Sequence, residues 1–439
     1  MKKSPLDQYL VLPVKNFIEK QTSVGILLIC AAVLAMIIAN SPLSEIYHSL
    51  WEQHIYIGIN DFVINKSVLH WINDGLMSMF FFSIGLEIKK EVLHGELSSF
   101  RGALLPLIAG IGGMIIPAII FSLFNNGTPA IGGWGIPMAT DIAFALGLLY
   151  LLGDKVPLSL KVFLTAIAVI DDLGSVLVIA LFYTSEISFY NLGIAAIFLG
   201  ILILANYIGI KNILFYMLVG FGGLWLAVSL SGIHATIAAV LAAFAIPNTS
   251  TIKTPLFLRK IKSLSFQITK NENPKKLSKH SEETEVIIQK ISLLTKEAIS
   301  PLQRLEYGLY RFINFFVLPI FAFANAGVTI NTNSFNFFLS PITLGIIIGL
   351  IIGKFCGIVL FTRLLVAIKL CKLPKGVNWK HIYGVGCLGG IGFTMSLFVT
   401  ELAYDDPTML TQAKIGILTA SILAGFIGYS YLNSISKTK

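Results

Sequence analysis

Four acidic residues and one lysine lie inside long apolar stretches, where a charged side chain is costly. The acids are Glu87, Asp141, Asp171 and Asp172, and the base is Lys354. A charge near the centre of a membrane-spanning helix costs roughly 2.5–3.5 kcal/mol on insertion scales, and an apolar residue would avoid that cost. We therefore interpret these five residues as functional candidates whose chemistry would be cation binding or proton exchange.

Asp171 and Asp172 are the deepest of these acids. About ten apolar residues flank the pair on each side, so both would lie near the middle of a bilayer. Adjacent residues of a helix point about 100° apart, so one carboxylate can face a cavity while the other faces a neighbouring helix. Two such acids suit cation binding or proton exchange. The alternative is a structural pair of buried, protonated and hydrogen-bonded acids.

Asp141 and Lys354 each allow two interpretations. Gly135 and Pro137 interrupt the apolar stretch just before Thr140 and Asp141, which predicts a broken helix lining a polar cavity. Asp141 could bind a cation directly, or it could compensate the positive end of a half-helix. Lys354 could extend its ammonium group toward the headgroups. It could instead pair with a mid-span carboxylate, as a proton carrier would.

Glu87 and His234 lie nearer the ends of their stretches. Glu87 is followed by Lys89, Lys90 and Glu91, so a solvated helix end is the simpler interpretation and a regulatory charge cluster the alternative. Histidine titrates near physiological pH. A single histidine at a membrane edge is more often structural, and a pH sensor is the alternative for His234.

The composition identifies the elements that must position these residues. The 439-residue chain is 55% hydrophobic and only 13% charged, with a mean hydropathy of +0.81. Soluble domains carry about 25% charged residues. This excludes a disordered chain, a nucleic-acid-binding domain and an ordinary cytosolic enzyme, and it predicts an all-α polytopic membrane protein. We expect twelve transmembrane helices, at about 23–40, 69–88, 103–124, 133–152, 160–183, 189–208, 213–230, 233–247, 312–327, 341–362, 380–399 and 410–432.

The Lys and Arg residues predict the sidedness of this bundle. With both termini cytoplasmic, 29 of the 32 fall in inside regions, Lys66 and Lys414 fall outside, and Lys354 remains within a span. This asymmetry fits the positive-inside rule and makes the net charge of +9 a feature of topology. Merging the stretches at 213–230 and 233–247 into one helix would instead place the most basic loop outside.

Two of the expected helices are interrupted. The fourth has Gly135 and Pro137, and the eleventh, YGVGCLGGIGFTMSLFV, is crowded with Gly384, Gly386, Gly389, Gly390 and Gly392, which cannot form a strong helix. Each is the centre of a trio, helices 3–5 and helices 10–12, and the two trios run in opposite orientations. This pattern predicts inverted repeats with a binding site between the two broken helices.

The remaining stretches carry weaker signals. We interpret residues 1–439 as one transmembrane domain, with 248–303 as a polar, flexible cytoplasmic loop. The outside loop 41–67 contains a partly alternating stretch at 54–59, which fits either a short hairpin or an irregular loop. The four cysteines show no CxxC spacing, and no phosphate-binding glycine motif is present, so neither a metal centre nor a nucleotide cofactor is expected.

Seven stretches together resemble the NhaA family of sodium/proton antiporters. They are GLEIKKE (85–91), ATDIAFALG (139–147), AVIDDLG (168–174), SGIHAT (231–236), LPIFAFANAGV (318–328), GKFCG (353–357) and GGIGFTMSLF (389–398). They occur in family order over about 310 residues. The rule that links broken helices to a central site was drawn in part from this same family, so it is no independent support.

The resemblance implies a transporter rather than an enzyme. It implies twelve spans with two crossed discontinuous helices and the exchange of cytoplasmic sodium or lithium for external protons across a bacterial inner membrane. It implies no cofactor and no nucleic-acid partner. It does imply a homodimer that forms through the 41–67 loop.

The resemblance also implies residue roles. Asp172 would be the principal sodium ligand, and Asp171 the neighbouring acid whose partner is Lys354. Asp141 and Thr140 would stand where the broken helix meets the site. Glu87, Glu306 and His234 would take part in the response to pH.

One departure from the family pattern bears on that response. Tyr307 and Tyr310 stand where the family usually has histidines, while Glu306 remains. Tyrosine does not titrate near neutrality, so a shifted pH profile is expected.

Two other functions remain open from the sequence. A sodium-coupled solute symporter could use the same broken helices and buried acids. An intramembrane aspartyl protease also uses two aspartates, but Gly153-Asp154 lacks the first glycine of the usual GxGD motif.

Overall fold

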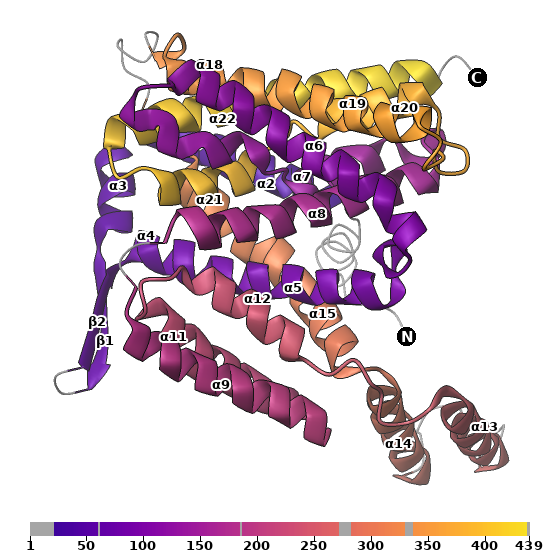
Figure 1. Ribbon diagram of the computed structural model, residues 1–439. Coiled ribbons are helices and arrows are strands. Elements are labelled where there is room, and N and C mark those ends of the chain that lie inside the picture. The colour runs from indigo at the N-terminus through magenta and orange to yellow at the C-terminus, as the bar shows by residue number, and fades with distance from the viewer. Residues whose placement is uncertain (1–21, 60–61, 185–186, 272–281, 330–336, 437–439) are drawn as a thin grey trace.

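The computed structural model describes residues 22–59, 62–184, 187–271, 282–329 and 337–436. These residues form a bundle of long helices that run in roughly the same direction, with a two-stranded hairpin at one end (Figure 1). Helices of the first half are α2 (Thr22–Ala39), α3 (Ser44–Glu52), α4 (Val68–His70), η2 (Trp71–Leu76), α5 (Met77–His94), η3 (Glu96–Ser98), α6 (Phe100–Asn125), η4 (Pro129–Met138), α7 (Ile142–Leu151), η5 (Gly153–Lys155), α8 (Leu158–Phe182), α9 (Phe189–Ile208), α10 (Ile213–Met217), η6 (Leu218–Trp225), α11 (Leu226–Ser229) and α12 (Ala235–Ala245).

The second half of the chain continues the bundle after two helices that lie outside it (Figure 1). Its helices are α13 (Thr254–Asn271), α14 (Glu282–Ala298), α15 (Pro301–Phe312), η7 (Ile313–Val317), α16 (Leu318–Asn325), α18 (Pro341–Ile348), η8 (Gly349–Gly353), α19 (Lys354–Ala367), α20 (Trp379–Leu388), α21 (Phe393–Ala403) and α22 (Pro407–Ser436).

Several of the helices are long and apolar enough to cross a membrane. Within the described residues, eight pass this test on length and hydropathy, and the bent pair α20 and α21 passes as a ninth. Two shorter apolar helices, 213–229 and 235–245, accompany them. The protein is therefore an all-α polytopic membrane protein.

Both interruptions expected from the sequence are present. Residues 129–138 form a 3-10 helix, and residues 139–141 separate it from α7. Residues 389–392 separate α20 from α21, and the two helices are bent by 44°. Gly384 and Gly386, which we expected to weaken the span, lie within α20, where added side chains would meet Leu432 and Phe355. Only the later glycines form the break.

The two breaks are hydrogen-bonded to each other. The backbone N–H of Asp141 donates to the carbonyl of Ile391 at 2.7 Å, and the Ser396 hydroxyl of α21 donates to the carbonyl of Ile136 at 2.8 Å. The backbone N–H of Asp141 and the carbonyl of Ile136, which lie at or next to the first interruption, thus form hydrogen bonds with the other interrupted helix. This is how irregular backbone is accommodated at membrane depth.

Two helices are longer than the apolar pattern predicts. The stretch expected at 312–327 begins at Pro301, because Ser300 caps the helix and Pro301 occupies its first turn. Its first half carries the charged residues Arg304, Glu306 and Arg311, so this part of the helix is not continuously apolar and was not expected to belong to the span. In the same way α5 continues past the expected end at 88 to His94.

The segment 248–303, which we expected to be flexible, is partly helical. It contains α13 and α14, which pack against each other. The most polar part of the segment, residues 272–281, lies outside the described residues. Counting polar residues missed the apolar positions that recur at helical spacing on both sides of that part.

The alternating stretch in the outside loop forms a strand. β1 (His54–Ile59) pairs antiparallel with β2 (Phe62–Ser67), in a register that joins His54 to Ser67 and Ile59 to Phe62. Of the two interpretations left open by the sequence, the hairpin is the one observed. It projects from the end of the bundle (Figure 1).

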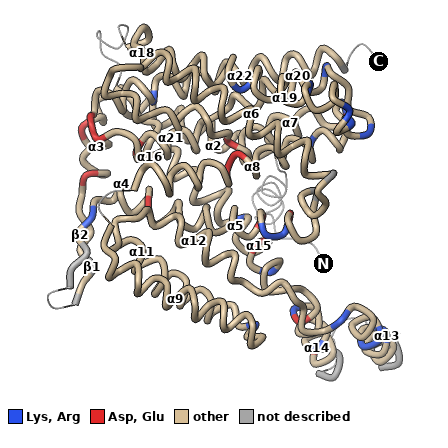
Figure 2. The backbone as a smooth tube through the Cα atoms, in the orientation of Figure 1, with Lys and Arg blue, Asp and Glu red and all other residues tan. Residues whose placement is uncertain are grey.

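Charged residues are distributed unequally between the ends of the bundle. Lys and Arg gather at the end where α22 terminates and on α13 and α14, while the end that carries β1 and β2 has few of them (Figure 2). We call the first the basic end. A separate group of acidic residues lies in the middle of the bundle, on and beside α8 (Figure 2).

Candidate functional site

The centre of the site is an ion pair sealed inside the bundle. Lys354 begins α19 and donates to the Asp171 carboxylate of α8, and both residues are fully buried. The aliphatic part of the lysine passes Gly113 of α6. Lys354 therefore pairs with a mid-span carboxylate and does not extend to the headgroups, which answers the question that its depth alone left open.

Thr140 connects this pair to both broken helices. Its hydroxyl oxygen lies 2.7 Å from Oδ2 of Asp171 and 3.0 Å from the carbonyl oxygen of Gly389. Thr140 is in the first break and Gly389 is in the second. A shift of either break would therefore be transmitted to the ion pair through one hydroxyl group.

Asp172, the next residue of α8, has a different environment. It is fully buried, and neither of its carboxylate oxygens has a hydrogen-bond partner among the described residues. The neighbouring hydroxyl oxygen of Ser175, also in α8, has none either. An uncompensated carboxylate in this position is strongly unfavourable. Among the described carboxylates that are buried without partners, only Asp172 has both oxygens unbonded, so a proton or a cation would stabilise it.

Asp141 binds the backbone of two half-helices. Its Oδ1 accepts from the N–H of Phe144 at 2.9 Å, which caps α7. Its Oδ2 accepts from the N–H and the hydroxyl of Thr394, at 3.1 and 2.5 Å, in the first turn of α21. One carboxylate thus faces the positive ends of two helices. This is the geometry expected for compensation of helix ends, while direct binding of a cation by Asp141, which also borders the cavity described next, stays a prediction.

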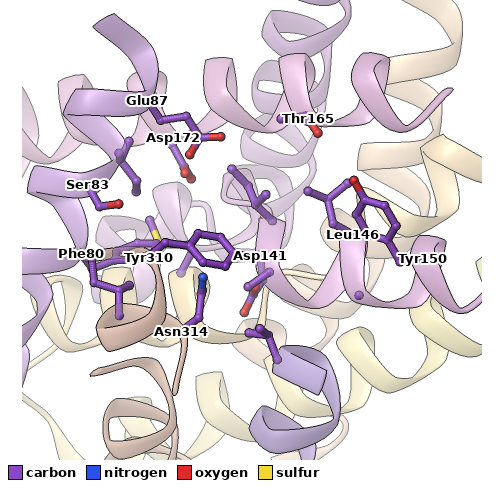
Figure 3. A pocket seen from close by; sticks show the side chains of 17 residues that line it. Phe80, Ser83, Glu87, Asp141, Leu146, Tyr150, Thr165, Asp172, Tyr310 and Asn314 are labelled. Carbon is purple, nitrogen blue, oxygen red and sulfur yellow. The ribbon is translucent and has the colours of Figure 1, made fainter. Parts of the chain in front are cut away.

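A cavity of about 270 Å³ lies between Asp172 and Asp141 and also borders Glu87. In Figure 3 the side chains of Glu87 and Asp172 lie next to each other, Asp141 lies across the cavity, and Tyr310 and Asn314 reach in from α15 and η7. The lining residues are Val24, Phe80, Ser83, Ile84, Glu87, Asp141, Ile142, Ala143, Leu146, Gly147, Tyr150, Thr165, Asp172, Tyr310, Ile313, Asn314 and Met395. Asp171 and Lys354 are absent from this lining, so the paired acid is sealed from the cavity and the unpaired acid borders it.

Glu87 belongs to this cavity and not to a solvated helix end. It is half-buried and borders the same space as Asp172. Just beyond it, Lys90 of α5 forms an ion pair with Glu306 of α15 at 2.7 Å. The two helices are thereby joined at the basic end, where a second cavity shares Tyr150 and Thr165 with the first.

The remaining candidate, His234, lies apart from the acids. Its Nε2 is 2.6 Å from the carbonyl oxygen of Tyr183, which only accepts, so Nε2 donates. The Tyr183 hydroxyl donates in turn to the carbonyl of Gly132 at 2.7 Å. Tyr183 follows the last residue of α8 and links His234 to the first broken helix. His234 thus lies near the C-terminal end of α8.

Sequence reasoning missed several residues of the site. Thr394 was within the GGIGFTMSLF stretch, directly after the glycine-rich break, but nothing local indicated that it would bond Asp141. Ser175 follows Asp171 by four residues, one helical turn, and that spacing was a usable signal. Asn314 is a polar residue at the start of an apolar stretch, which was a weaker one.

Unpaired and paired carboxylates, held between two interrupted helices of a membrane bundle, define the class of secondary ion transporters. The chain belongs to the Na⁺/H⁺ antiporter family, since the family model described as Na+/H+ antiporter 1 matches residues 15–432.

Similar proteins cover nearly the whole chain. The chain is 47% identical to the Na(+)/H(+) antiporter NhaA of Oleidesulfovibrio alaskensis, over 97% of this chain and 94% of that protein. It is 46% identical to the Na(+)/H(+) antiporter NhaA of Acidithiobacillus ferrooxidans, over 97% of this chain and 98% of that protein. It is also 47% identical to the Na(+)/H(+) antiporter NhaA of Wolinella succinogenes, over 95% of this chain and 92% of that protein.

Proposed function

We propose that the protein exports cytoplasmic sodium, or lithium, in exchange for external protons. The observation that carries this proposal is Asp172, whose two carboxylate oxygens are buried beside the cavity with no hydrogen-bond donor among the described residues. The family of the chain and the names of its relatives agree with sodium and protons as the exchanged ions.

Coupling would follow from competition for one carboxylate. An ionised carboxylate in the bundle needs a compensating charge, because its desolvation is otherwise uncompensated. Sodium bound at Asp172, assisted by Asp171, supplies that charge and excludes the proton. A proton neutralises the group and excludes sodium. Thr140, Asp141 and Lys354 would hold the surrounding helices in the arrangement that makes either state stable.

We propose a topology for this exchange. The chain would cross the bacterial inner membrane twelve times with both termini cytoplasmic, and the basic end would face the cytoplasm. The third to fifth expected spans (α6, η4 with α7, and α8) and the tenth to twelfth (α18 with α19, α20 with α21, and α22) would form inverted repeats. The two interrupted spans would cross at the site. Rocking of one repeat against the other would open the site alternately to each side.

The exchange would be electrogenic and regulated by pH. If more than one proton returns for each sodium ion, net positive charge moves inward, and the membrane potential contributes about 2.3 kcal/mol per elementary charge per 100 mV. Glu87, Glu306 and His234 are the proposed pH-responsive residues. With Tyr307 and Tyr310 beside Glu306, carboxylates and not histidines would set the response at the basic end.

We also propose a homodimer. The β1–β2 hairpin of the 41–67 loop projects from the bundle and would pair with that of a second copy. Removing residues 54–67 should yield monomers in detergent without abolishing exchange, as measured by light scattering during gel filtration. A deletion variant that remained dimeric would exclude the hairpin as the interface.

The proposed exchange can be tested in vesicles that contain the purified protein and a preset pH gradient. Adding sodium or lithium should collapse the gradient, and adding potassium should not. Asp172→Asn should abolish the response, because an amide neither ionises nor exchanges a proton. Asp154→Asn, a change at an exposed acid of η5, is the matched control. An active Asp172→Asn protein would overturn the assignment, and equal responses to potassium would overturn the ion.

A further inference from the structure

Ser175 is a buried hydroxyl residue that the exchange proposed above does not use. It lies in α8, one helical turn after the two aspartates, and is only 4% exposed. Its hydroxyl oxygen has no hydrogen-bond partner among the described residues. A buried polar group without a partner is unfavourable, so this serine calls for an explanation other than stability.

The other two hydroxyl side chains of α8 are both bonded. Ser159 and Thr165 donate to backbone carbonyls, at 2.6 and 3.0 Å. Thr165 uses the carbonyl four residues earlier, which is the usual acceptor for a serine or threonine within a helix. For Ser175 that acceptor would be the carbonyl of Asp171, and the structure has no such bond. The Ser175 hydroxyl is therefore not turned back onto its own backbone.

Around the axis of α8, Ser175 lies between the two aspartates. At about 100° per residue, it is about 40° from Asp171 and about 60° from Asp172. Side chains three and four residues apart are neighbours on the surface of a helix. One turn of α8 thus brings together four buried oxygens without partners, namely Oδ1 of Asp171, Oδ1 and Oδ2 of Asp172, and Oγ of Ser175.

These four oxygens are suitable ligands for a small, hard cation. Hard cations take carboxylate, carbonyl and water oxygens in proteins. A serine hydroxyl also has two lone pairs, so it can face a cation without adding a further negative charge to the site. The hydroxyl of Thr140, in contrast, already contacts Asp171 and the carbonyl of Gly389. Ser175 is therefore the hydroxyl that is free to turn toward an ion.

Ser175 stands just beyond the cavity. Thr165 and Asp172 are the residues of α8 that line the cavity (Figure 3), and Ser175 is not among the lining residues. An ion that enters through the cavity would meet Asp172 first and would approach Ser175 only after leaving the wider space. Ion selection depends on how protein oxygens replace the hydration shell. A ligand at the buried end of this path is placed to make that replacement.

We propose that the Ser175 hydroxyl is a ligand of the transported cation, beside the Asp172 carboxylate, and that it favours sodium over lithium. This inference rests on the proposed exchange and adds a residue to its site. Selectivity between cations of different size depends on the number of ligands and on the size of the site. Lithium is the smaller ion and is satisfied by fewer oxygens, so losing one oxygen should weaken the binding of sodium more.

The test measures the sodium and lithium concentrations for a half-maximal response in the vesicle assay described above. Ser175→Ala should raise the sodium concentration about tenfold, as expected for the loss of one polar contact to a charge. It should raise the lithium concentration less. The response at saturating sodium should stay near that of the parent, because Asp172 still exchanges the ion for a proton.

Two further variants separate ligation from packing. Ser175→Cys nearly keeps the size of the side chain but replaces the oxygen by sulfur, a weak acceptor, so it should behave like Ser175→Ala. Thr362→Val is the matched control. It removes a buried hydroxyl that donates to the carbonyl of Ile358 at 2.6 Å, and it should leave the half-maximal sodium concentration unchanged.

Thermal unfolding in detergent gives a readout that does not need transport. Without sodium, Ser175→Ala should unfold at or above the temperature of the parent, because it removes a buried hydroxyl that has no partner. Sodium should raise the unfolding temperature of the parent, since it binds the folded state. Ser175→Ala should need about tenfold more sodium for the same rise, which is the same loss of one polar contact to a charge.

The results that would overturn the inference differ from those that would overturn the exchange. A parent that responds to sodium, with Ser175→Ala and Ser175→Cys at the same half-maximal concentration, would exclude Ser175 as a ligand and leave the exchange intact. A Ser175→Cys protein that matches the parent while Ser175→Ala does not would attribute the effect to volume. Equal losses for sodium and lithium would exclude the preference. A parent without any response to sodium would overturn the exchange, and the inference with it.

Discussion

Lys354 and Asp171 differ from the partly exposed pair of Lys90 and Glu306 in what the removal of one partner leaves behind. Both are fully buried, so Lys354→Ala leaves a carboxylate without its cation inside the bundle. Breaking such a pair costs about 3–5 kcal/mol. We expect Lys354→Ala to lower the midpoint of thermal unfolding in detergent markedly. Asp171→Leu should lower it too, because it leaves the ammonium group of Lys354 buried without a carboxylate.

The double variant Lys354→Met/Asp171→Leu separates the pair from its surroundings. It strands no charge, so it should be more stable than either single variant. Lys90→Met, which breaks the half-exposed pair with Glu306, is the control and should cost at most about 1 kcal/mol. A double variant no more stable than the worse single variant would show that packing, and not charge, determines the loss.

At the residue scale, the sequence identifies which side chains are unusual but not how they are partnered. Asp171, Asp172 and Lys354 stand out because apolar neighbours surround them, and depth follows from counting residues. Which of two adjacent aspartates faces Lys354 depends on the rotation of α8 against α19, which local sequence does not specify. The bond from Thr394 to Asp141 joins residues 253 positions apart, and no spacing rule reaches that far.

At the element scale, Asp141 holds the two interrupted helices together. Its carboxylate caps α7 and accepts two bonds from Thr394 of α21. Asp141→Ala removes these acceptors, and the loss of a cap costs about 1 kcal/mol for a helix. Asp141→Asn retains one acceptor oxygen, so it should be closer to the parent in thermal stability.

Transport by the same variants separates the two roles considered for Asp141. If it serves the helix ends, Asp141→Asn should still collapse a pH gradient with sodium, with a smaller loss than Asp172→Asn. An Asp141→Asn protein that is fully stable but inactive would instead identify Asp141 as a direct ligand. The sodium concentration for a half-maximal response, measured in the vesicle assay, decides between these outcomes.

The close approach of α6 and α19 is a second element-scale feature. A Cβ atom on Gly112 would lie 2.6 Å from the carbonyl oxygen of Gly357. Because α19 carries Lys354 and α6 packs along it, Gly112→Ala should separate the two helices and reduce both thermal stability and exchange. Gly200→Ala in α9 is the control, since a Cβ there meets nothing within 4 Å, and alanine favours a helix over glycine by about 1 kcal/mol. Equal stability of the two variants would contradict the packing argument.

The positions of helices and of their interruptions could be predicted well from the sequence, and their ends less well. Apolar runs locate the spans because the bilayer demands them, and glycine and proline locate the breaks. The polar first half of α15 and the helices α13 and α14 escaped because their apolar residues occupy one face only. A scan for continuous hydrophobicity does not register a one-sided pattern.

At the scale of the whole molecule, the unequal distribution of Lys and Arg predicts which end faces the cytoplasm. The prediction depends on the turn near Gly232 between α11 and α12. If residues 213–247 formed one span, every later loop would change sides. In the structure α11 ends at Ser229, α12 starts at Ala235, and Gly232 has a positive φ of 85°. This turn keeps the helices separate and places α13 and α14 at the basic end.

The sidedness can be measured with single cysteines in a variant whose four native cysteines are serines. Lys66→Cys in β2 should react with a membrane-impermeant thiol reagent in intact cells. Lys296→Cys in α14 should react only after the membrane is permeabilised, although both side chains are exposed in the structure. The contrast arises because Lys and Arg are retained on the cytoplasmic side during insertion. Labelling of Lys296→Cys in intact cells would reverse the assignment, and the basic end, with the cavity that leads from it to Asp172, would then take up its ions from outside.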